Sequence, residues 1–411
     1  MRYLVLLLIA SVVTALSLFL WDYIWKTGRR ISFLAAAMAV SVVAVCELIY
    51  YGLAFPQWQG HLLFPLLYDS TLASLSWLTM FFLCLPVLLL WAAGCALWRL
   101  VHGRVKPEPA EALPDSSNMT RRTFLKGAAA ALPLAALATS GYGNIDGDTR
   151  LDTVRHDLYF PNLPDYLEGY RIGQISDAHM GMFFGPEDLQ KALDQLAVQQ
   201  VNRLEITGDL IDELAYLPEC QKILTQNAGR FPDGIDFCYG NHEYYRGLEE
   251  ITQMLLQTPV RILRNSHICA STGRGQGLSG VSGTDAAPFY IVGADYSFAN
   301  GDEAFAAERN SFVDEALQGV PQEAFVIMLA HHSAFLDEGF SRHIPLTLSG
   351  HTHGGQIILL EPLVEAVGFK YLRGLFQQDG CWGYVSRGTG HWLPFRLGCS
   401  REVSVFTLHN Q

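Results

Sequence analysis

Five short segments of the chain carry the carboxylate, amide and imidazole groups that bind divalent metal ions in proteins. In order along the sequence they are Asp177-Ala178-His179, Gly208-Asp209, Gly240-Asn241-His242-Glu243, His331-His332 and Gly350-His351-Thr352-His353-Gly354-Gly355. Such ligands, without thiolate, suit Mn, Fe, Zn or Ni, and the ligand types do not choose among these ions. The eight cysteines form no Cys-x-x-Cys pair, so a zinc–thiolate site is not indicated.

The chemistry that suits these ligands is the hydrolysis of phosphate esters. Two ions about 3.5–4 Å apart lower the pKa of a bridging water, which supplies hydroxide at neutral pH, and they bind two phosphate oxygens during an in-line displacement. His242 suits protonation of the departing alkoxide, because an imidazole titrates near neutral pH. No covalent intermediate is required, so Ser349 and Thr352 are not expected to act as nucleophiles.

An apolar run typical of a buried strand precedes each of the five segments. These runs are Arg171–Ser176, Arg203–Thr207, Ile235–Tyr239, Phe325–Ala330 and Pro345–Ser349. Pro186–Gln200 has the periodicity of an amphipathic helix, and further strands are expected at Phe289–Gly293, Ile357–Leu360, Gly383–Ser386 and Val403–Leu408. Ligands bind at the carboxyl ends of the strands in open α/β sheets, so we expect the five segments to meet at one edge.

Each segment taken alone has an ordinary structural explanation. A Gly-Asp after a strand is usually a turn, and a single buried histidine is usually a hydrogen-bonded core residue. The five segments together, each after a strand and in this order, are more simply explained by one shared metal centre.

The order of the motifs, from DxH through GD, GNHE and H to GHTHGG, resembles that of the calcineurin-like metallophosphoesterases over roughly residues 150–411. The resemblance is closest to the bacterial membrane-associated or twin-arginine-exported branch, which includes cell-wall phosphatases and relatives of UDP-2,3-diacylglucosamine hydrolases. It implies an α/β fold, which we expect to be a four-layer αββα sandwich. It also implies one metal ion held by Asp177, His179, Asp209 and His353, and a second held by Asp209, Asn241, His331 and His351. Asp209 would bridge the ions, and His242 would be the catalytic residue beside the phosphate.

The sequence departs from the usual family pattern in two places. Ala178 and Met180 replace commoner leucines, and His331-His332-Ser333 replaces His-Asn-Pro; His331 is preferred as the ligand because it comes first after the strand. Several aromatic residues near the motifs could line a pocket for an apolar or sugar-bearing leaving group, although packing is an equal explanation for each: Phe183, Phe184, Tyr244, Tyr245, His391 and Trp392.

The first 105 residues are apolar and predict three membrane-spanning helices, at about Tyr3–Leu20, Ile31–Phe55 and Leu72–Leu100, the last containing Pro86. Basic residues set the expected orientation. Lys26, Arg29 and Arg30 follow the first span, Arg99, Arg104 and Lys106 lie at or after the end of the third, and residues 56–70 contain neither Lys nor Arg. Positive-inside bias therefore places the amino terminus outside, 21–30 inside, 56–71 outside and 101–126 inside.

Residues 106–150 are expected to be a linker that contains an export signal. Thr120-Arg121-Arg122-Thr123-Phe124-Leu125-Lys126 and the apolar run 127–138 resemble a twin-arginine signal, with a candidate cleavage site at Ala136-Leu137-Ala138. The alternative is that the two arginines are ordinary charges beside a membrane span. On the first interpretation the twin-arginine export machinery is a partner, and residues 151–411 are carried across the cytoplasmic membrane.

The catalytic part of the chain is acidic. Residues 146–411 hold 34 acidic and 18 basic residues, whereas residues 1–145 hold 6 and 10, within a total net charge of −12. This balance disfavours a nucleic-acid substrate and leaves a phosphate ester, lipid-linked or cell-wall-linked, as the expected one. Two alternatives stay open: a cytoplasmic-face hydrolase of a nucleotide-linked lipid precursor, and a metal-binding sensor or scaffold with vestigial activity.

Overall fold

The computed structural model describes residues 2–25, 31–58, 61–102, 121–270, 289–357, 369–391 and 393–411. The chain divides into two compact units, Met1–Ile145 and Asp146–Gln411. This division lies close to the expected boundary at residue 151. The candidate metal ligands all belong to the second unit.

The first unit is helical. It contains α1 (Arg2–Trp25), α2 (Ile31–Trp58) and α3 (Phe64–His102), and α4 (Arg121–Thr149) begins in it. Within the described residues, two stretches are long and apolar enough to cross a membrane, Leu34–Phe55 in α2 and Phe64–Trp98 in α3. The apolar part of α1, Leu8–Ile24, is shorter. Two of the three expected spans are therefore supported by length and composition.

The expected orientation of the helices depends on basic residues that the structure does not describe. Lys26, Arg29, Arg30, Arg104 and Lys106 lie outside the described residues. The arginine pair, Arg121 and Arg122, begins α4, so part of the segment that we expected to be a linker is helical. The topology and the export signal remain predictions.

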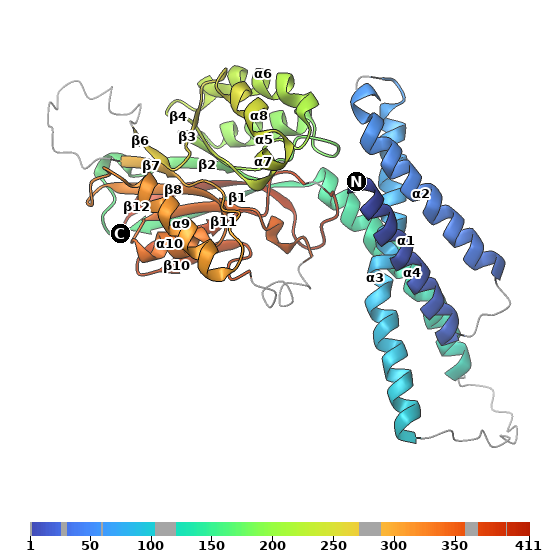
Figure 1. Cartoon of the computed structure of the whole chain (residues 1–411). Helices are drawn as coiled ribbons and strands as arrows, with labels where there is room; N and C mark the ends of the chain where they lie inside the picture. Colours follow the sequence, from blue (N-terminus) through green and yellow to red (C-terminus); the bar gives the residue numbers. More distant parts are fainter. Residues whose placement is uncertain are drawn as a thin grey trace, which may run out of the picture. The chain divides into compact units, whose positions relative to one another are not determined.

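The second unit contains two six-stranded sheets within the described residues (Figure 1). In pairing order, the first sheet consists of β1 (Leu151–Phe160), β12 (Arg401–Asn410), β2 (Arg171–Ile175), β3 (Arg203–Thr207), β4 (Gly234–Cys238) and β5 (Val260–Ile262). The second consists of β10 (Gly374–Gln378), β11 (Cys381–Val385), β9 (Leu346–Gly350), β8 (Phe325–His332), β7 (Phe289–Gly293) and β6 (Ser266–Ala270). Strands β2 to β5 run parallel, as do β7, β8, β9 and β11.

The two sheets share one apolar core. Buried side chains of the first sheet, such as Ile172 and Phe406, belong to the same cluster as Ile291, Ile327 and Leu348 of the second. Burial of this kind stabilises the fold by about 25 cal/mol for each Å² of apolar surface removed from water. The core therefore holds the ends of the two sheets in a fixed relation.

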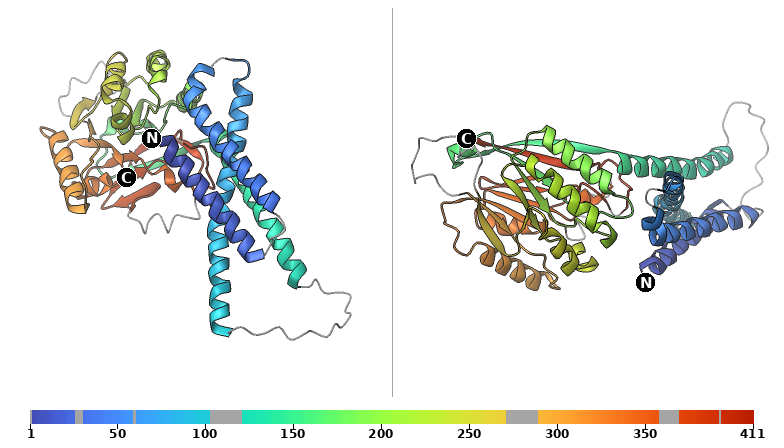
Figure 2. Two further views of the ribbon diagram at one scale, coloured as in Figure 1. Left: turned by 45° about the vertical axis from the view of Figure 1, so that its right-hand side comes forward. Right: turned by 90° about the horizontal axis from the view of Figure 1, so that it is seen from above.

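Helices lie against both sheets (Figures 1 and 2). The first sheet contacts α5 (Pro186–Val198) and α8 (Leu248–Leu255), and α6 (Leu217–Asn227) packs on these two helices. The second sheet contacts α9 (Asp302–Ala316) and α10 (Phe335–Ser341). The mixed α/β architecture agrees with the sequence expectation, whereas the strict four-layer order remains a prediction.

Helix α5 shows how local sequence fixes an element. Pro186 occupies its first turn, and the Asp188 side chain accepts a hydrogen bond from the backbone N–H of Gly185 at 3.1 Å, which caps the helix. Of the five residues that the periodicity places on its apolar face, four are buried and Ala197 is half-buried; the buried ones are Leu189, Ala192, Leu193 and Leu196. The helix therefore packs with the side that the sequence periodicity indicates.

Four strands were not expected from the sequence, namely β1, β5, β6 and β10. All four lie at the edge of a sheet, and β5 is only three residues long. In contrast, the strand expected at Ile357–Leu360 is not formed by its described part: Ile357 makes a single bridge to Leu397, and residues 358–360 lie outside the described residues. Hydrophobic periodicity identifies buried strands better than edge strands, which explains these differences.

Candidate metal centre

The expected ligands meet at the carboxyl ends of β2, β3, β4, β8 and β9. Among the described residues, three groups hold ligand atoms that all lie within 4.8 Å of one another. Their members are Asp177, His179 and His353; His179, Asp209 and His242; and Asp209, His331 and His351. The groups overlap at His179 and Asp209, so they form one continuous site.

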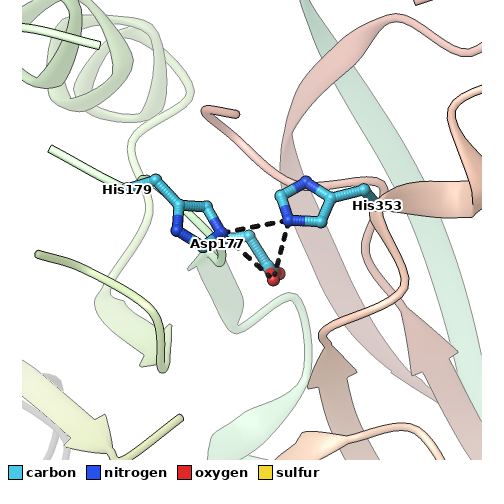
Figure 3. A group of neighbouring side chains, drawn as sticks. All are labelled: Asp177, His179 and His353. Atoms are coloured by element: carbon cyan, nitrogen blue, oxygen red, sulfur yellow. Dashed lines mark hydrogen bonds and ion pairs between the residues drawn. The ribbon is translucent and has the colours of Figure 1, made fainter. Parts of the chain in front are cut away.

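The first group brings together residues from both sheets (Figure 3). The Nε2 atoms of His179 and His353 lie 3.0 Å apart. Asp177 Oδ1 lies 3.6 Å from His353 Nε2 and 4.0 Å from His179 Nε2. Figure 3 shows both imidazole rings directed toward the carboxylate. Two ring nitrogens and a carboxylate oxygen therefore converge in a buried space, as the ligands of one cation do.

The group of Asp209, His331 and His351 lies beside the first group. Asp209 Oδ2 is 3.2 Å from His331 Nε2, which is 3.2 Å from His351 Nδ1. The side-chain oxygen of Asn241 lies 3.0 Å from the same His351 nitrogen. Asp209 Oδ2 is also 3.6 Å from His179 Nε2 in the first group. The position of Asp209 between the two groups is the one that a bridging carboxylate would take.

The backbone at these positions is unusual. Ten non-glycine residues among the described ones have positive φ, and five of them are Asp177, His179, Asp209, His351 and His353. This conformation is sparsely populated by residues that have a Cβ atom, and it persists only where the surrounding structure imposes it. The fold therefore holds the backbone at these five residues in a strained conformation, which directs their side chains into the site.

Two motif glycines leave room for the ligand carboxylates. A Cβ atom at Gly240 would lie 2.2 Å from Asp209 Oδ1, and one at Gly350 would lie 2.2 Å from Asp177 Oδ2. A Cβ atom does not approach a non-bonded oxygen atom this closely. The glycines that precede Asn241 and His351 are therefore needed where the backbone passes close to a carboxylate.

Hydrogen bonds fix the orientation of the ligand groups. His331 Nδ1 lies 2.7 Å from the Thr207 carbonyl oxygen; donation of its N–H to this oxygen leaves the Nε2 lone pair facing Asp209. Asp177 accepts hydrogen bonds from the Ser176 hydroxyl at 2.6 Å and from the backbone N–H of His351 at 3.0 Å. These hydrogen bonds orient the ligand groups toward one another.

The site shows opposing pKa shifts. Burial disfavours the protonated form of His331, but the charges of Asp209 and Asp177 outweigh burial and raise its pKa to about 10. Burial and the positive charge of His331 hold the pKa of His351 well below its usual value. Burial also raises the pKa of the Asp177 carboxyl. The carboxylates favour positive charge among these imidazoles, and a divalent cation would supply that charge in place of protons.

Asp212 has a role that the sequence did not indicate. Its Oδ1 atom lies 2.5 Å from His242 Nδ1, 3.6 Å from His179 Nδ1 and 2.9 Å from the Nε of Arg246. Burial opposes its ionisation, but the hydrogen bonds of the two histidines outweigh burial and lower the Asp212 pKa. Its only sequence signal is its place three residues after Asp209, which is too weak to distinguish it from a turn residue.

Arg396 was also not anticipated. Its side chain is fully buried, and its guanidinium donates hydrogen bonds to the carbonyl oxygens of His353, Arg387 and Gly390 at 3.0, 2.6 and 2.9 Å. These bonds hold the backbone that carries His353. The role of Arg396 depends on tertiary contacts and leaves no motif in the sequence.

The remaining expected residues divide into two sets. Phe183, Phe184 and His391 are buried and do not form an exposed pocket wall, because they pack inside the domain, and Trp392 lies outside the described residues. Tyr244 and Tyr245, in contrast, lie in α7 (Asn241–Arg246) beside His242. His332 is not in any of the three ligand groups, and its Nδ1 accepts the backbone N–H of Ala334 at 3.1 Å.

Comparisons with known proteins identify the family to which this chain is similar. The model of the calcineurin-like phosphoesterase family matches residues 170–355. The uncharacterized metallophosphoesterase YkuE of Bacillus subtilis (strain 168) is 28% identical over 305 residues, covering 71% of this chain and 98% of that protein. An uncharacterized metallophosphoesterase of Helicobacter pylori (strain J99) is 30% identical over 281 residues, covering 66% of this chain and 68% of that protein. A transmembrane protein with metallophosphoesterase domain from Danio rerio is 28% identical over 279 residues, covering 65% and 59%.

Proposed function

Because this chain belongs to the calcineurin-like metallophosphoesterase family, we propose that residues 151–411 hydrolyse phosphate esters with the help of two divalent metal ions. The family resemblance expected from the motifs is confirmed by these matches. The number of ions, the type of ester and the detailed mechanism are our proposal. The fold that we propose for the domain is the four-layer αββα sandwich.

One observation carries the proposal: Asp209 Oδ2 lies 3.6 Å from His179 Nε2 on one side and 3.2 Å from His331 Nε2 on the other. In the proposed centre, Asp177, His179, Asp209 and His353 hold the first ion. Asp209, Asn241, His331 and His351 hold the second. The residues fit such ions because all except the half-buried His351 are buried, and because they offer oxygen and imidazole nitrogen and face one another at 3.0 to 4.0 Å. Mn, Fe, Zn or Ni would suit this set.

The protein residues around the ions would supply proton transfer and orientation. Two divalent ions, when bound, provide a nucleophile at neutral pH and offset the charge of the phosphate. The Asp212 carboxylate holds His242 through Nδ1 at 2.5 Å, so the Nε2 atom of His242 is the one available to protonate the departing alkoxide. The backbone N–H of His242 is held in turn by Asp209 Oδ1 at 2.8 Å.

A test of this proposal is hydrolysis of bis(p-nitrophenyl) phosphate and p-nitrophenyl phosphate by the purified full chain with added Mn²⁺. We expect turnover of at least one of the two substrates. Asp209→Ala and His351→Ala should abolish it, because each removes a ligand of the second ion. Background rates with Mn²⁺, Fe²⁺, Zn²⁺ and Ni²⁺ alike would favour a sensor or scaffold with vestigial activity.

The chain is membrane-associated, as its two apolar helices and its transmembrane relative indicate. We propose further that α1 forms a third span and that a twin-arginine signal at Arg121-Arg122 carries the catalytic domain to the outer side of the cytoplasmic membrane. The substrate would then be a lipid-linked or cell-wall-linked phosphate ester. A reporter fused after Gln411 should be active outside, and replacement of both arginines by lysine should retain it inside. An unchanged location after that replacement would instead favour the cytoplasmic-face alternative.

A further inference from the structure

Four aromatic side chains form a connected cluster beside the metal centre, here called the aromatic wall: Tyr244, Tyr245, Tyr296 and Phe298. Phe298 lies at its middle, with ring centroids 5.2 Å from Tyr244, 5.8 Å from Tyr245 and 4.8 Å from Tyr296. The first two residues belong to α7, and the other two follow β7. The wall is therefore built by segments that follow one strand of each sheet, β4 and β7.

The aromatic wall contacts the proposed site at two places. The ring of Tyr245 lies 5.8 Å from that of His242. The ring of Tyr296 lies 5.9 Å from that of His331 and 5.7 Å from that of His351. A phosphate bound at the ion that Asp209, His331 and His351 would hold would have this wall beside it, so a substituent of the ester would meet aromatic rings.

The wall is held rigidly from behind. The Tyr244 hydroxyl donates to the Asp295 carboxylate at 2.6 Å, and the Nε of Arg264 donates to the same carboxylate at 2.6 Å. Asp295 is only 5% exposed, and its backbone N–H donates to the Asn265 side-chain oxygen at 2.9 Å. A surface that is fixed before binding loses little entropy when a ligand orders on it.

Two members of the wall expose much of their aromatic side chains to solvent. Tyr245 is 61% exposed and Phe298 is 43% exposed. The neighbouring Arg246 is paired with Asp212, and Arg264, whose guanidinium carbon lies 5.8 Å from the centre of the Tyr244 ring, is paired with Asp295. Because both arginines already pair with a carboxylate, the exposed rings of the wall favour an uncharged substituent over a second phosphate group.

We infer that the aromatic wall binds a flat aromatic substituent of the phosphate ester that the metal centre hydrolyses. This inference rests on the proposed function and narrows its substrate class. The aromatic rings of the wall would contact the aromatic substituent of the ester by stacking or edge to face. Phe298 would be the central contact. A nucleobase-bearing ester and a simple aryl ester share this chemistry.

The test compares three phosphonates that share the same charged head group: methylphosphonate, cyclohexylphosphonate and phenylphosphonate. Their dissociation constants are measured by isothermal titration calorimetry on the detergent-solubilised full chain loaded with Mn²⁺. We expect phenylphosphonate to bind about 10-fold more tightly than the other two, because stacking on an aromatic side chain is strong enough for this difference. A nucleoside phosphonate in a further titration distinguishes a nucleobase from a plain aryl group.

The variants are Phe298→Ala, Phe298→Leu and, as a matched control, Tyr159→Ala, which removes an exposed aromatic ring on β1. Phe298→Ala should weaken phenylphosphonate binding about 10-fold and leave methylphosphonate binding unchanged. Phe298→Leu should make phenylphosphonate and cyclohexylphosphonate bind equally, because it keeps apolar area and removes the flat ring. Tyr159→Ala should change none of the three constants.

Two results would overturn the inference while sparing the proposed function. In one, methylphosphonate and phenylphosphonate bind equally to the unaltered protein. In the other, cyclohexylphosphonate binds as tightly as phenylphosphonate, which would show recognition of apolar area such as an acyl chain. No binding of any phosphonate, methylphosphonate included, would refute the proposed function and the inference together.

Discussion

Strands β3 and β4 carry two buried groups of charged residues, one at each end, and the two groups are compensated differently. Near their amino ends, Asp236 accepts hydrogen bonds from Arg203 at 2.5 Å and from Arg261 at 2.7 Å. At their carboxyl ends, Asp209 forms all its ion pairs within the described residues with histidines, as does Asp177.

The difference separates a structural ion pair from a binding site. Arginine brings a permanent positive charge, so Asp236 and Arg203, both fully buried, neutralise each other without any ligand. Histidines bring lone pairs and titrate near neutral pH, so their compensation of a buried carboxylate depends on protons that a metal ion can replace. Buried carboxylates surrounded by histidine rather than arginine are therefore the ones that indicate a metal centre.

The largest expected difference between the two groups of charged residues is in their contribution to the free energy of unfolding. In the metal-free protein, Asp236→Asn should lower the free energy of unfolding by about 3–5 kcal/mol, because it removes the carboxylate that pairs with both Arg203 and Arg261 and leaves Arg203 with only Glu205, whose burial opposes ionisation. Added Mn²⁺ should still stabilise this variant, since ligand binding to the folded state raises stability. Asp209→Asn should show the reverse, keeping its fold and losing the stabilisation by Mn²⁺.

These free energies can be measured by urea denaturation of the full chain in detergent, followed by tryptophan fluorescence with and without Mn²⁺. The distinction between a structural ion pair and a metal site would be contradicted if Mn²⁺ stabilised neither variant. It would fail equally if Asp236→Asn cost no stability.

The next effect concerns proton transfer within the carboxyl-end group. His242→Asn should lower kcat about 100-fold, because it removes the group expected to protonate the leaving alkoxide. The bound ions should stay, since His242 is not one of the proposed ligands. Steady-state phosphate release from an alkyl phosphate ester, whose alkoxide leaving group needs the proton, measures this change, with His409→Asn on β12 as a control that should leave kcat unaltered. Loss of both activity and metal in His242→Asn would instead make His242 a ligand.

The smallest effect concerns Glu205, which is fully buried beside the arginine-paired group. Burial and the charge of Asp236 raise its pKa well above the ordinary value of 4.5. The folded protein therefore keeps a proton that the unfolded chain releases, so the contribution of Glu205 to stability is present below pH 4.5 and is lost as the pH rises toward the folded pKa.

Glu205→Gln removes this titration, so its stability relative to the unaltered protein should increase above pH 4.5 by at most about 1.4 kcal/mol per pH unit. Thermal or urea unfolding of both proteins at pH 4.5, 5.5 and 6.5 would measure the slope. A difference that does not change with pH would show that Glu205 is ionised in the fold.

The sequence predicted the parts of this comparison that depend on local pattern. Asp177, Asp209 and His351 each follow an apolar run, and a run of this kind is both a strand signal and the start of a sheet edge. The motif glycines were recognisable in the sequence, but their cause is a tertiary contact, because a Cβ atom at Gly240 would meet Asp209 and one at Gly350 would meet Asp177.

What could not be predicted depends on contacts between distant segments. Asp212 matters because the fold places it against His242, and no pattern of residues announces that contact. Phe298 joins the aromatic wall only because the segment after β7 lies beside α7, and an isolated aromatic residue reads as ordinary packing. Edge strands such as β1 were missed for a related reason, since exposed positions interrupt their apolar pattern.

The claim on which the rest depends is that one carboxylate, Asp209, joins two metal sites. Metal analysis of the purified full chain after dialysis, by inductively coupled plasma mass spectrometry, tests it most directly. We expect two divalent ions per chain in the unaltered protein and in Asp236→Asn, and at most one in Asp209→Asn. Hydrolysis by a chain that holds fewer than one ion, or two ions retained by Asp209→Asn, would contradict the account.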